Sequence, residues 1–151
     1  MLRNKPPPIP TFALASAAEV EQQFYAALRR ADIEALMSLW ADDDDIVCVH
    51  PGGSRAVGPA AVRASFEAIF ANGAIDIHPE QARCLEAAAF AVHSVLERVQ
   101  VRGPRGDGSG WVVATNVYIE TQIGWRIVAH HAGPGLQSKP QVGAGPAAVL
   151  H

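Results

Sequence analysis

The sequence is poor in cysteine and in charge, and it lacks a long apolar run. Its 151 residues include two cysteines, Cys48 and Cys84, too few for a disulfide framework and without the spacing of a zinc site. Charged residues make up 18% of the chain and the formal net charge is −3, which gives no basic surface for nucleic acid or an anionic membrane. No stretch approaches the ~20 apolar residues of a membrane span. We therefore expect a reduced, cytoplasmic protein that binds small molecules or other proteins.

The sequence does contain enough apolar material for one domain. Apolar residues make up 49% of it, and a chain of this length can bury a core without disulfides or metals. Its composition predicts three parts: an extended proline-rich lead-in over 1–15, a folded domain over 16–133, and a tail rich in glycine, proline and alanine over 134–151.

Three helices are predicted in the first half of the domain. Ser16 begins the first, because Glu19 three residues later completes a capping box. Asp32 is the predicted N-cap of the second, which ends at Trp40. Pro59 opens the third. Their apolar stripes are formed by Val20, Phe24, Tyr25 and Leu28, by Ile33, Leu36, Met37 and Trp40, and by Val62, Phe66, Ile69 and Phe70.

Strand patterns dominate the second half of the chain. Short strands are predicted over 46–49, 75–77 and 82–85, and long strands over 88–101, 111–121 and 125–132. Helices followed by long hairpin-connected strands favour an α+β domain with an antiparallel sheet over an alternating α/β fold. The long strands carry apolar residues on both faces. Since helices cover one face, we expect a homodimer through the outer face of the sheet.

Residues 40–59 concentrate the features of a site. After Trp40 and an acidic turn at 42–45, the strand 46–49 delivers His50 to a Pro-Gly-Gly bend. A titratable side chain between a buried strand and a rigid bend is well placed at the rim of a pocket. The alternative for His50 is a structural role, as a cap on the bend.

The order of these motifs resembles that of a known family. The motifs are a helical hairpin ending in Trp-Ala-Asp-Asp, a strand ending in His-Pro-Gly, a Gly-Pro that opens the third helix, and a closing Gly-Trp-Arg-Ile-Val-Ala-His-His. Over about residues 16–133 they are similar to the SnoaL-like branch of the nuclear transport factor two-like superfamily, to which ketosteroid isomerase belongs. The resemblance implies a cone-shaped fold in which three N-terminal helices pack on a strongly curved antiparallel sheet enclosing one pocket. We expect no cofactor and no bound metal.

Ketosteroid isomerase uses an aspartate as base, and a tyrosine with a neutral aspartic acid as oxyanion donors. The resemblance places the base at His50, which precedes a proline at the end of the first strand. The neutral acid falls eight residues before the turn glycine, Gly124, and therefore at Asn116. The tyrosine falls at Phe24, with Tyr25 beside it.

The residue types at these positions change the chemistry. The imidazole of His50 has an ordinary pKa near 6.5 and suits a general base at neutral pH. The amide NH2 of Asn116 can donate to a developing oxyanion. Phe24 offers no hydroxyl, and Phe66 and Trp40 stand where the isomerase has further tyrosines. The resemblance thus implies isomerase-, dehydratase- or cyclase-like proton transfer by His50 and Asn116 and does not support steroid isomerisation.

The strand pattern adds further pocket residues. Alternation along the last strand puts His131 on the face of Ile127 and His130 on the other. The resemblance implies that the His131 face lines the pocket and that the His130 face meets a partner subunit. Asn116 shares a face with Tyr118. The predicted ligand-binding residues are Phe24, Tyr25, Trp40, Phe66, Tyr118 and His131.

The sequence leaves several alternatives open. Arg55 either meets an acidic ligand or is a solvated loop residue, and the pattern does not fix whether the shared face of His93 and Glu97 looks into the pocket. His50, His93 and His131 suit zinc in residue type but lack a ligand-spacing signature. Three functions remain: a binding domain for a small apolar or carbonyl-containing ligand, an acid–base enzyme, and a dimeric assembly module with a vestigial pocket.

Overall fold

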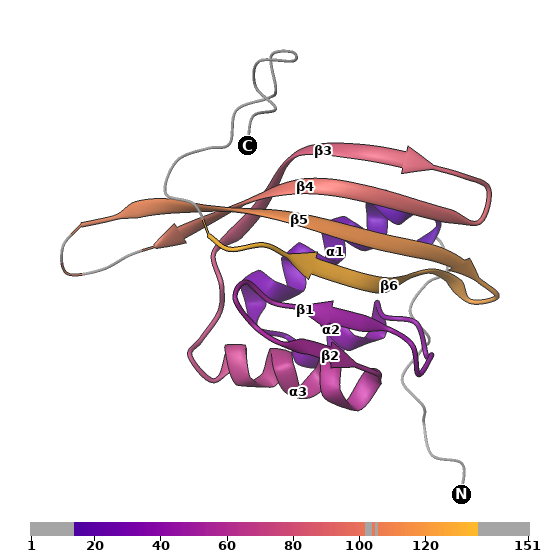
Figure 1. Ribbon diagram of the computed structural model, residues 1–151, viewed down its shortest axis with the longest axis horizontal. Coiled ribbons are helices and arrows are strands. Elements are labelled where there is room, and N and C mark those ends of the chain that lie inside the picture. The colour runs from indigo at the N-terminus through magenta and orange to yellow at the C-terminus, as the bar shows by residue number, and fades with distance from the viewer. Residues whose placement is uncertain (1–13, 102–103, 105, 136–151) are drawn as a thin grey trace, which may run out of the picture.

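The structure, a computed structural model, describes residues 14–101, 104 and 106–135. They form three helices packed on one six-stranded sheet (Figure 1). Two helices come first, then two short strands, the third helix and four long strands. The predicted α+β class is therefore confirmed. Of the predicted lead-in and tail, residues 1–13 and 136–151 lie outside the described residues.

Each helix begins where the sequence predicts a cap. The Oγ of Ser16 accepts a hydrogen bond from the backbone N–H of Glu19 at 3.1 Å, and the Oδ1 of Asp32 accepts one from the N–H of Ala35 at 3.1 Å. Pro59 occupies the first position of the third helix. No described helix has both the length and the apolar character needed to cross a membrane. The helices are α1 (Ala17–Arg30), α2 (Ile33–Ser38) and α3 (Pro59–Phe70).

The sheet is mixed and open. Its strands are β1 (Val47–Val49), β2 (Arg55–Val57), β3 (Ile77–Glu86), β4 (Phe90–Val101), β5 (Gly108–Thr121) and β6 (Gly124–Ala132), in the spatial order β2-β1-β6-β5-β4-β3. β1 runs parallel to β6, and the other neighbouring pairs are antiparallel. The sheet differs from the predicted antiparallel one in this single pairing. β1 and β6 come from opposite ends of the domain, so no hairpin fixes their relative direction.

The edge strand β3 is longer than its sequence pattern predicts. Two short segments are expected at 75–77 and 82–85, whereas the structure has one ten-residue strand. Its pairing with β4 is irregular between Glu80 and Arg83, where Gln81 has a φ of 49°. Such an irregularity interrupts the alternation of side chains, which explains why the pattern breaks into two pieces.

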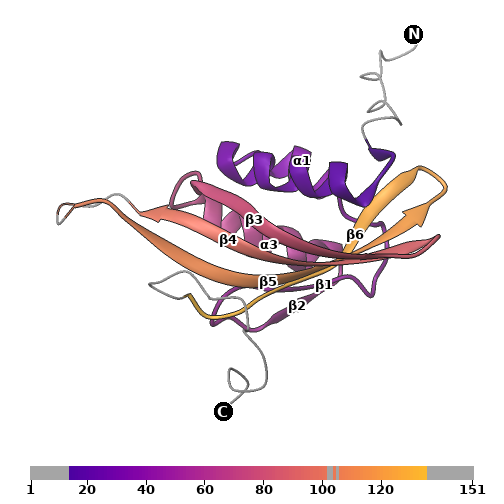
Figure 2. The same ribbon diagram turned by 90° about the horizontal axis from the view of Figure 1, so that it is seen from above.

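The helices cover one face of the sheet. Figure 2 shows α1 lying along the long strands, on one side of the sheet. The core between these layers contains the buried aromatic rings of Phe24, Tyr25, Phe66 and Tyr118. The opposite, outer face exposes apolar side chains, including Leu85 and Val113. Any enclosed site therefore lies between the helices and the inner face.

Candidate functional site

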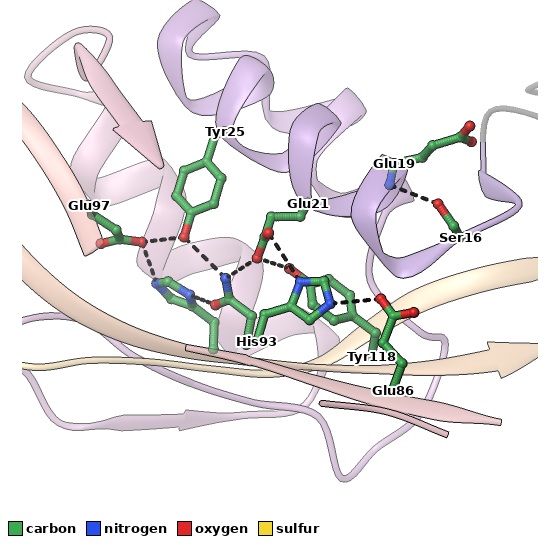
Figure 3. A network of polar contacts seen from close by, with 10 residues as sticks. Ser16, Glu19, Glu21, Tyr25, Glu86, His93, Glu97 and Tyr118 are labelled. Atoms are coloured by element: carbon green, nitrogen blue, oxygen red, sulfur yellow. Dashed lines mark hydrogen bonds and ion pairs between the residues drawn. The ribbon is translucent and has the colours of Figure 1, made fainter. Parts of the chain in front are cut away.

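A buried polar network lies between α1 and the inner face of the sheet (Figure 3). Its members come from α1, β4, β5 and β6, and none is more than 7% exposed. Burying polar side chains costs free energy unless they find partners, so such a cluster inside an apolar core marks a candidate site. The members are Glu21, Tyr25, His93, Glu97, Asn116, Tyr118 and His130.

Regular secondary structure brings these side chains together. Glu21 and Tyr25 lie one turn apart on the face of α1 that is turned to the sheet. His93, Asn116 and His130 are direct neighbours on three strands, because the register pairs the first with the second and the second with the third. The network is a row across the sheet covered by one helix.

At one end of this row, three side chains converge on the carboxylate of Glu21. The hydroxyl of Tyr118 donates to Oε1 at 2.9 Å, and Nδ2 of Asn116 donates to the same oxygen at 3.2 Å. Nδ1 of His93 lies 3.1 Å from Oε2. Figure 3 shows Glu21 reaching down from α1 toward the side chains of His93 and Tyr118. Contacts on both oxygens hold this carboxylate in one orientation.

Asn116 connects the two ends of the row. Its Nδ2 also donates to the hydroxyl oxygen of Tyr25 at 3.1 Å, and its Oδ1 accepts from Nδ1 of His130 at 2.6 Å. This second contact assigns the proton of His130 to Nδ1 and the lone pair to Nε2. Burial, together with nearby His50 and His131, lowers the pKa of His130 to about 3, so the ring is neutral at physiological pH.

At the other end lies Glu97, which has one hydrogen-bond donor among the described residues. The hydroxyl of Tyr25 donates to its Oε2 at 2.6 Å, and Nε2 of His130 lies 4.0 Å from the same oxygen. Burial raises the pKa of Glu97 to about 7, while the Tyr25 hydrogen bond lowers it and the charge of Glu21 raises it. Near neutral pH, Glu97 is divided between its acid and carboxylate forms and can give or take a proton.

His50 lies at the end of β1 and faces the same region. Its ring centre is 4.7 Å from that of Phe66, edge-on, and 6.4 Å from that of His130. Nε2 of His50 lies 3.0 Å from Oγ of Ser65, which donates its own proton to the carbonyl of Val62 at 2.7 Å. We therefore assign the proton of His50 to Nε2 and the lone pair to Nδ1. Burial lowers the pKa of His50, which favours the neutral ring.

A pocket of about 150 Å³ opens at this end of the row. Its titratable lining groups are His50, Glu97 and His130. Apolar side chains form most of the remaining wall, among them Leu28, Phe66, Ile69, Ile77 and Val99. A mostly apolar wall with a few convergent polar groups is the usual form of a small-molecule site.

A larger hollow of about 360 Å³ lies on the surface between α2 and α3. Its lining includes Trp40, Asp42 and Arg63, and Arg63 is held in ion pairs with Glu34 and Glu67. The resemblance predicts one pocket, whereas the structure has a larger hollow in addition to the interior pocket. We place the candidate site in the smaller, interior pocket, because buried titratable groups converge there.

The interior pocket contains part of the predicted site. His50 and Phe66 line it. Asn116 lies behind Tyr25 and His130, and the pocket lining does not include it. The structure therefore does not bring His50 and Asn116 together on the pocket lining, where His50 lies with Glu97 and His130.

Four other predicted ligand-binding residues lie outside the lining of the interior pocket. Phe24 packs edge-on against the rings of Tyr25 and Phe66, at 5.1 and 6.0 Å between ring centres. Tyr25 and Tyr118 belong to the polar network, and Trp40 lines the larger hollow. All four are buried, and the lining of the interior pocket includes none of them.

The predicted orientations of His130 and His131 are reversed. His130 is 5% exposed and belongs to the interior network, whereas His131 is exposed on the outer face. The cause is a bulge in β6: Ile127 pairs with Tyr118, but Ala129 pairs with Val117, the next residue back along β5. The extra residue shifts the alternation by one, so period-two counting gives the wrong face beyond Ile127.

The structure also decides the alternatives that the sequence leaves open. Arg55 is exposed on β2 and is not among the residues that line the interior pocket. His93 and Glu97 share the inner face but contact different partners, Glu21 and Tyr25. His131 lies on the opposite face of the sheet from His93, so the zinc set of His50, His93 and His131 is not assembled.

Of the two carboxyl groups that organise the network, sequence reasoning left the position of Glu97 open and missed Glu21. Each carries a recognisable signal. Glu21 lies four and seven residues before Tyr25 and Leu28, and so on the buried stripe of its helix. Glu97 lies two residues after Val95 on the same strand, and both are buried. This spacing puts the carboxyl group of Glu97 on the core face of the strand. An acidic residue at a core position of an amphipathic pattern is the feature that would have found both.

The chain matches the profile of the SnoaL-like domain family over residues 18–136. No curated protein matches it in sequence. Among solved structures, it is similar to a candidate association domain of calcium/calmodulin-dependent protein kinase type II from Thiobacillus denitrificans, with 31% identity and a TM-score of 0.72 over 80% of this chain and 96% of that one.

Two further structures are comparable. One is a candidate dehydratase of the nuclear transport factor two-like family from Streptomyces avermitilis, with 30% identity, a TM-score of 0.69, and coverage of 78% of this chain and 92% of that one. The other is a protein of unknown function from Pseudomonas putida that shares the nuclear transport factor two-like fold, with 21% identity, a TM-score of 0.68, and coverage of 83% and 88%. The resemblance predicted from sequence motifs is thus confirmed.

Proposed function

The chain belongs to the SnoaL-like domain family, and from that premise we propose that its interior pocket binds a small carbonyl-containing ligand and moves a proton on it. The observation that carries the proposal is the Glu97 carboxyl at the wall of an apolar pocket, with a pKa raised to about 7. A carboxyl kept partly protonated at neutral pH can donate a hydrogen bond to a carbonyl oxygen and stabilise the charge that develops there.

His50 is the proposed base. Its Nε2 is engaged with Ser65, which leaves the lone pair on Nδ1 of a neutral ring. In the proposed step, Glu97 in its acid form hydrogen-bonds the ligand carbonyl while His50 takes a proton from the adjacent carbon. The product of this step is an enol or enolate, to which the proton returns at a different position. The reaction class is isomerase- or dehydratase-like.

Asn116 and Tyr25 are positioning residues in this scheme. Tyr25 donates to Glu97, and Asn116 holds both the Tyr25 hydroxyl and the His130 ring. Such second contacts fix the direction in which a catalytic group points. This role replaces direct carbonyl polarisation by Asn116.

The dimensions of the pocket limit the ligand. An apolar cavity of about 150 Å³ is large enough for a molecule such as benzene. Within the described part of the chain, no lysine or arginine lines the pocket. The negative charge of an anionic group there would therefore lie near Glu97 without a compensating positive charge. We therefore expect a neutral ligand, or a neutral ring or enone within a longer molecule.

The test is proton exchange in deuterated water. The protein is incubated with a panel of small cyclic ketones and enones, and loss of α-proton signal is followed by NMR. We expect exchange of at least one compound, with loss of at least tenfold in rate in Glu97→Gln and in His50→Ala. Glu80→Gln, a carboxylate change on β3 outside the pocket, should leave the rate unchanged. Ligand-induced chemical shifts without exchange would reduce the function to binding, and no response to any compound would overturn the proposal.

A second candidate function is assembly, favoured by the outer face of the sheet. One row across all six strands on this face is apolar, as the register shows for Leu85, Val92, Val117, Ala129, Val47 and Val57. The next row carries Arg83 and Arg55 at its two ends, with His131 between them. An apolar band flanked by charge is typical of an interface between copies of a chain.

Light scattering during gel filtration tests this second candidate. We expect the wild type to be a dimer or larger, and Val117→Glu on the outer face to shift it toward the monomer. Thr115→Ser, on the same strand and face, is the matched control. A monomeric wild type at high micromolar concentration would remove the assembly candidate while leaving the proton-exchange test in force.

A further inference from the structure

A second cluster of chemically active side chains lies at the open edge of the sheet, beside the Glu21 end of the network. Cys84 on β3 pairs directly with His93 on β4, and Glu86 follows Cys84 by two residues, on the same face. The Sγ of Cys84, a carboxylate oxygen of Glu86 and a ring nitrogen of His93 all lie within 4.8 Å of one another. Cys84 and Glu86 are exposed and His93 is buried, so the cluster is open to solvent on one side.

The second observation is the orientation of the His93 ring. Its Nδ1 is held 3.1 Å from Oε2 of Glu21, which points Nε2 toward Glu86 (Figure 3). Nε2 lies 3.4 Å from Oε1 of Glu86, at ion-pair range, yet it forms no hydrogen bond with any described residue. The His93 side chain is fully buried. A buried ring nitrogen without a hydrogen-bond partner, aimed at a thiol and a carboxylate, is the arrangement of a metal ligand.

From this geometry we propose that the chain binds a zinc-like divalent ion through Sγ of Cys84, the carboxylate of Glu86 and Nε2 of His93, with solvent as a fourth ligand. Thiolate, imidazole and carboxylate are the ligand types that zinc accepts in tetrahedral sites. Glu21 then acts from behind His93, fixing the ring and its tautomer as carboxylates commonly do at metal sites.

To bind an ion, the three ligand atoms must move closer together than they are in the structure. Metal–ligand bonds of ~2.0–2.3 Å place neighbouring tetrahedral ligands roughly 3.3–3.8 Å apart, whereas the three ligand atoms here lie within 4.8 Å. His93 is fixed by its burial and by Glu21. The exposed side chains of Cys84 and Glu86 are free to turn toward it by rotamer changes of low cost.

Binding would release the thiol proton of Cys84 to solvent, since the thiolate is the ligand. Burial and the carboxylates of Glu21 and Glu86 raise the pKa of Cys84. A metal ion must therefore displace this proton, so we expect zinc binding to strengthen as the pH rises.

Cobalt(II) is the probe that tests the site. The purified full chain is dialysed against a chelator, the chelator is removed, and cobalt(II) is titrated in. We expect a thiolate-to-cobalt charge-transfer band in the near ultraviolet that saturates at one ion per chain and disappears when zinc is added. Cys84→Ser should abolish the band. Cys48→Ala, which removes the buried thiol outside the cluster, should retain it.

Zinc calorimetry identifies the other two ligands. Glu86→Gln is exposed and should fold normally, and we expect it to weaken zinc binding at least tenfold. His78→Asn, a histidine change on the same strand but outside the cluster, should bind zinc as the wild type does. For His93, whose replacement endangers the fold, nitrogen-15 NMR of the wild type should show a zinc-dependent shift of Nε2 larger than that of Nδ1.

Absence of the cobalt band in the wild type would overturn the proposal. So would a band that survives Cys84→Ser, or zinc binding that Glu86→Gln leaves unchanged. The site does not involve the interior pocket, so either this proposal or the proton-exchange proposal can fail without the other.

Discussion

The two ends of the interior network contain the same kinds of side chain and differ in how those side chains are supplied with hydrogen bonds. At the edge end, Glu21 has contacts from His93, Asn116 and Tyr118. At the pocket end, Glu97 has a hydrogen bond from Tyr25. Both carboxyl groups are buried and both lie between α1 and the sheet.

In the proposed function, this difference separates a carboxylate that positions its neighbours from the carboxyl group that acts on the ligand. Contacts on both oxygens leave Glu21 fixed and orient the residues around it. A single donor does not offset the burial of Glu97, and the pKa of Glu97 rises to about 7. The two buried carboxyl groups are of one residue type and differ in the number of donors around them.

The largest expected effect is at the edge end. Glu21→Ala leaves the ring of His93, the amide of Asn116 and the hydroxyl of Tyr118 without their common acceptor in a buried region. We expect a loss of about 4 kcal/mol in the free energy of unfolding, measured by urea denaturation. Glu67→Ala, which removes an exposed carboxylate of α3, is the control and should cost well under about 1 kcal/mol. Equal losses in the two variants would contradict the proposed role of Glu21.

At the pocket end, we expect the free energy of unfolding to depend on pH through Glu97. The pKa of Glu97 rises from 4.5 to about 7 on folding, so the folded state binds more protons than the unfolded state in this interval. The contribution of protonated Glu97 to the free energy of unfolding is therefore complete below pH 4.5. As the pH rises through 7, the protein loses about 3 kcal/mol of this free energy. Glu97→Gln, which resembles the protonated acid, should lack this loss. Unfolding free energies of wild type and variant that run parallel from pH 4.5 to pH 8 would exclude it.

The two tyrosines provide a matched pair that separates the ends. Tyr25→Phe removes the hydrogen bond that lowers the pKa of Glu97, so this pKa should rise further, as followed by carbon-13 NMR of the carboxyl group. Tyr118→Phe removes a donor to Glu21 and should leave the titration of Glu97 in place. Each variant should cost about 1–2 kcal/mol of stability. A similar rise of the Glu97 pKa in both variants would show that the ends are not independent.

The smallest effect is expected at the outer face. His131→Ala removes an exposed side chain, and we expect a change of less than about 0.5 kcal/mol in the unfolding free energy at low protein concentration. His130→Ala, one residue away, removes a buried ring from the network and should cost several times more. A larger loss in His131→Ala than in His130→Ala would restore the orientation predicted by simple alternation.

The local features of the fold could be predicted from the sequence. Ser16, Asp32 and Pro59 start the helices where their capping chemistry places them. Asn116 and Tyr118 face the core, as the alternation along their strand indicates. These features depend on hydrogen bonds and side-chain periodicity within a few residues, which a sequence displays directly.

The candidate site could be predicted only in part. His50 was expected at the pocket because a strand and a bend hold it there, and it lines the pocket. The position of Glu97 stayed open, since the strand pattern does not fix which face looks into the pocket and its partner Tyr25 is 72 residues away in the chain. The bulge that turns His130 inward depends on the pairing of β6 with β5, so the pattern of β6 alone assigned the interior position to His131.

By itself, then, the sequence determined the family, the α+β class and the positions of the helices, because caps and periodic apolar residues act over short stretches of chain. The tertiary structure alone decided that β1 runs parallel to β6, that His130 faces inward, and that one buried glutamate is surrounded by donors while the other titrates near neutral pH. These outcomes depend on which distant segments meet, and the pKa of a buried carboxyl is set by the groups that surround it in space.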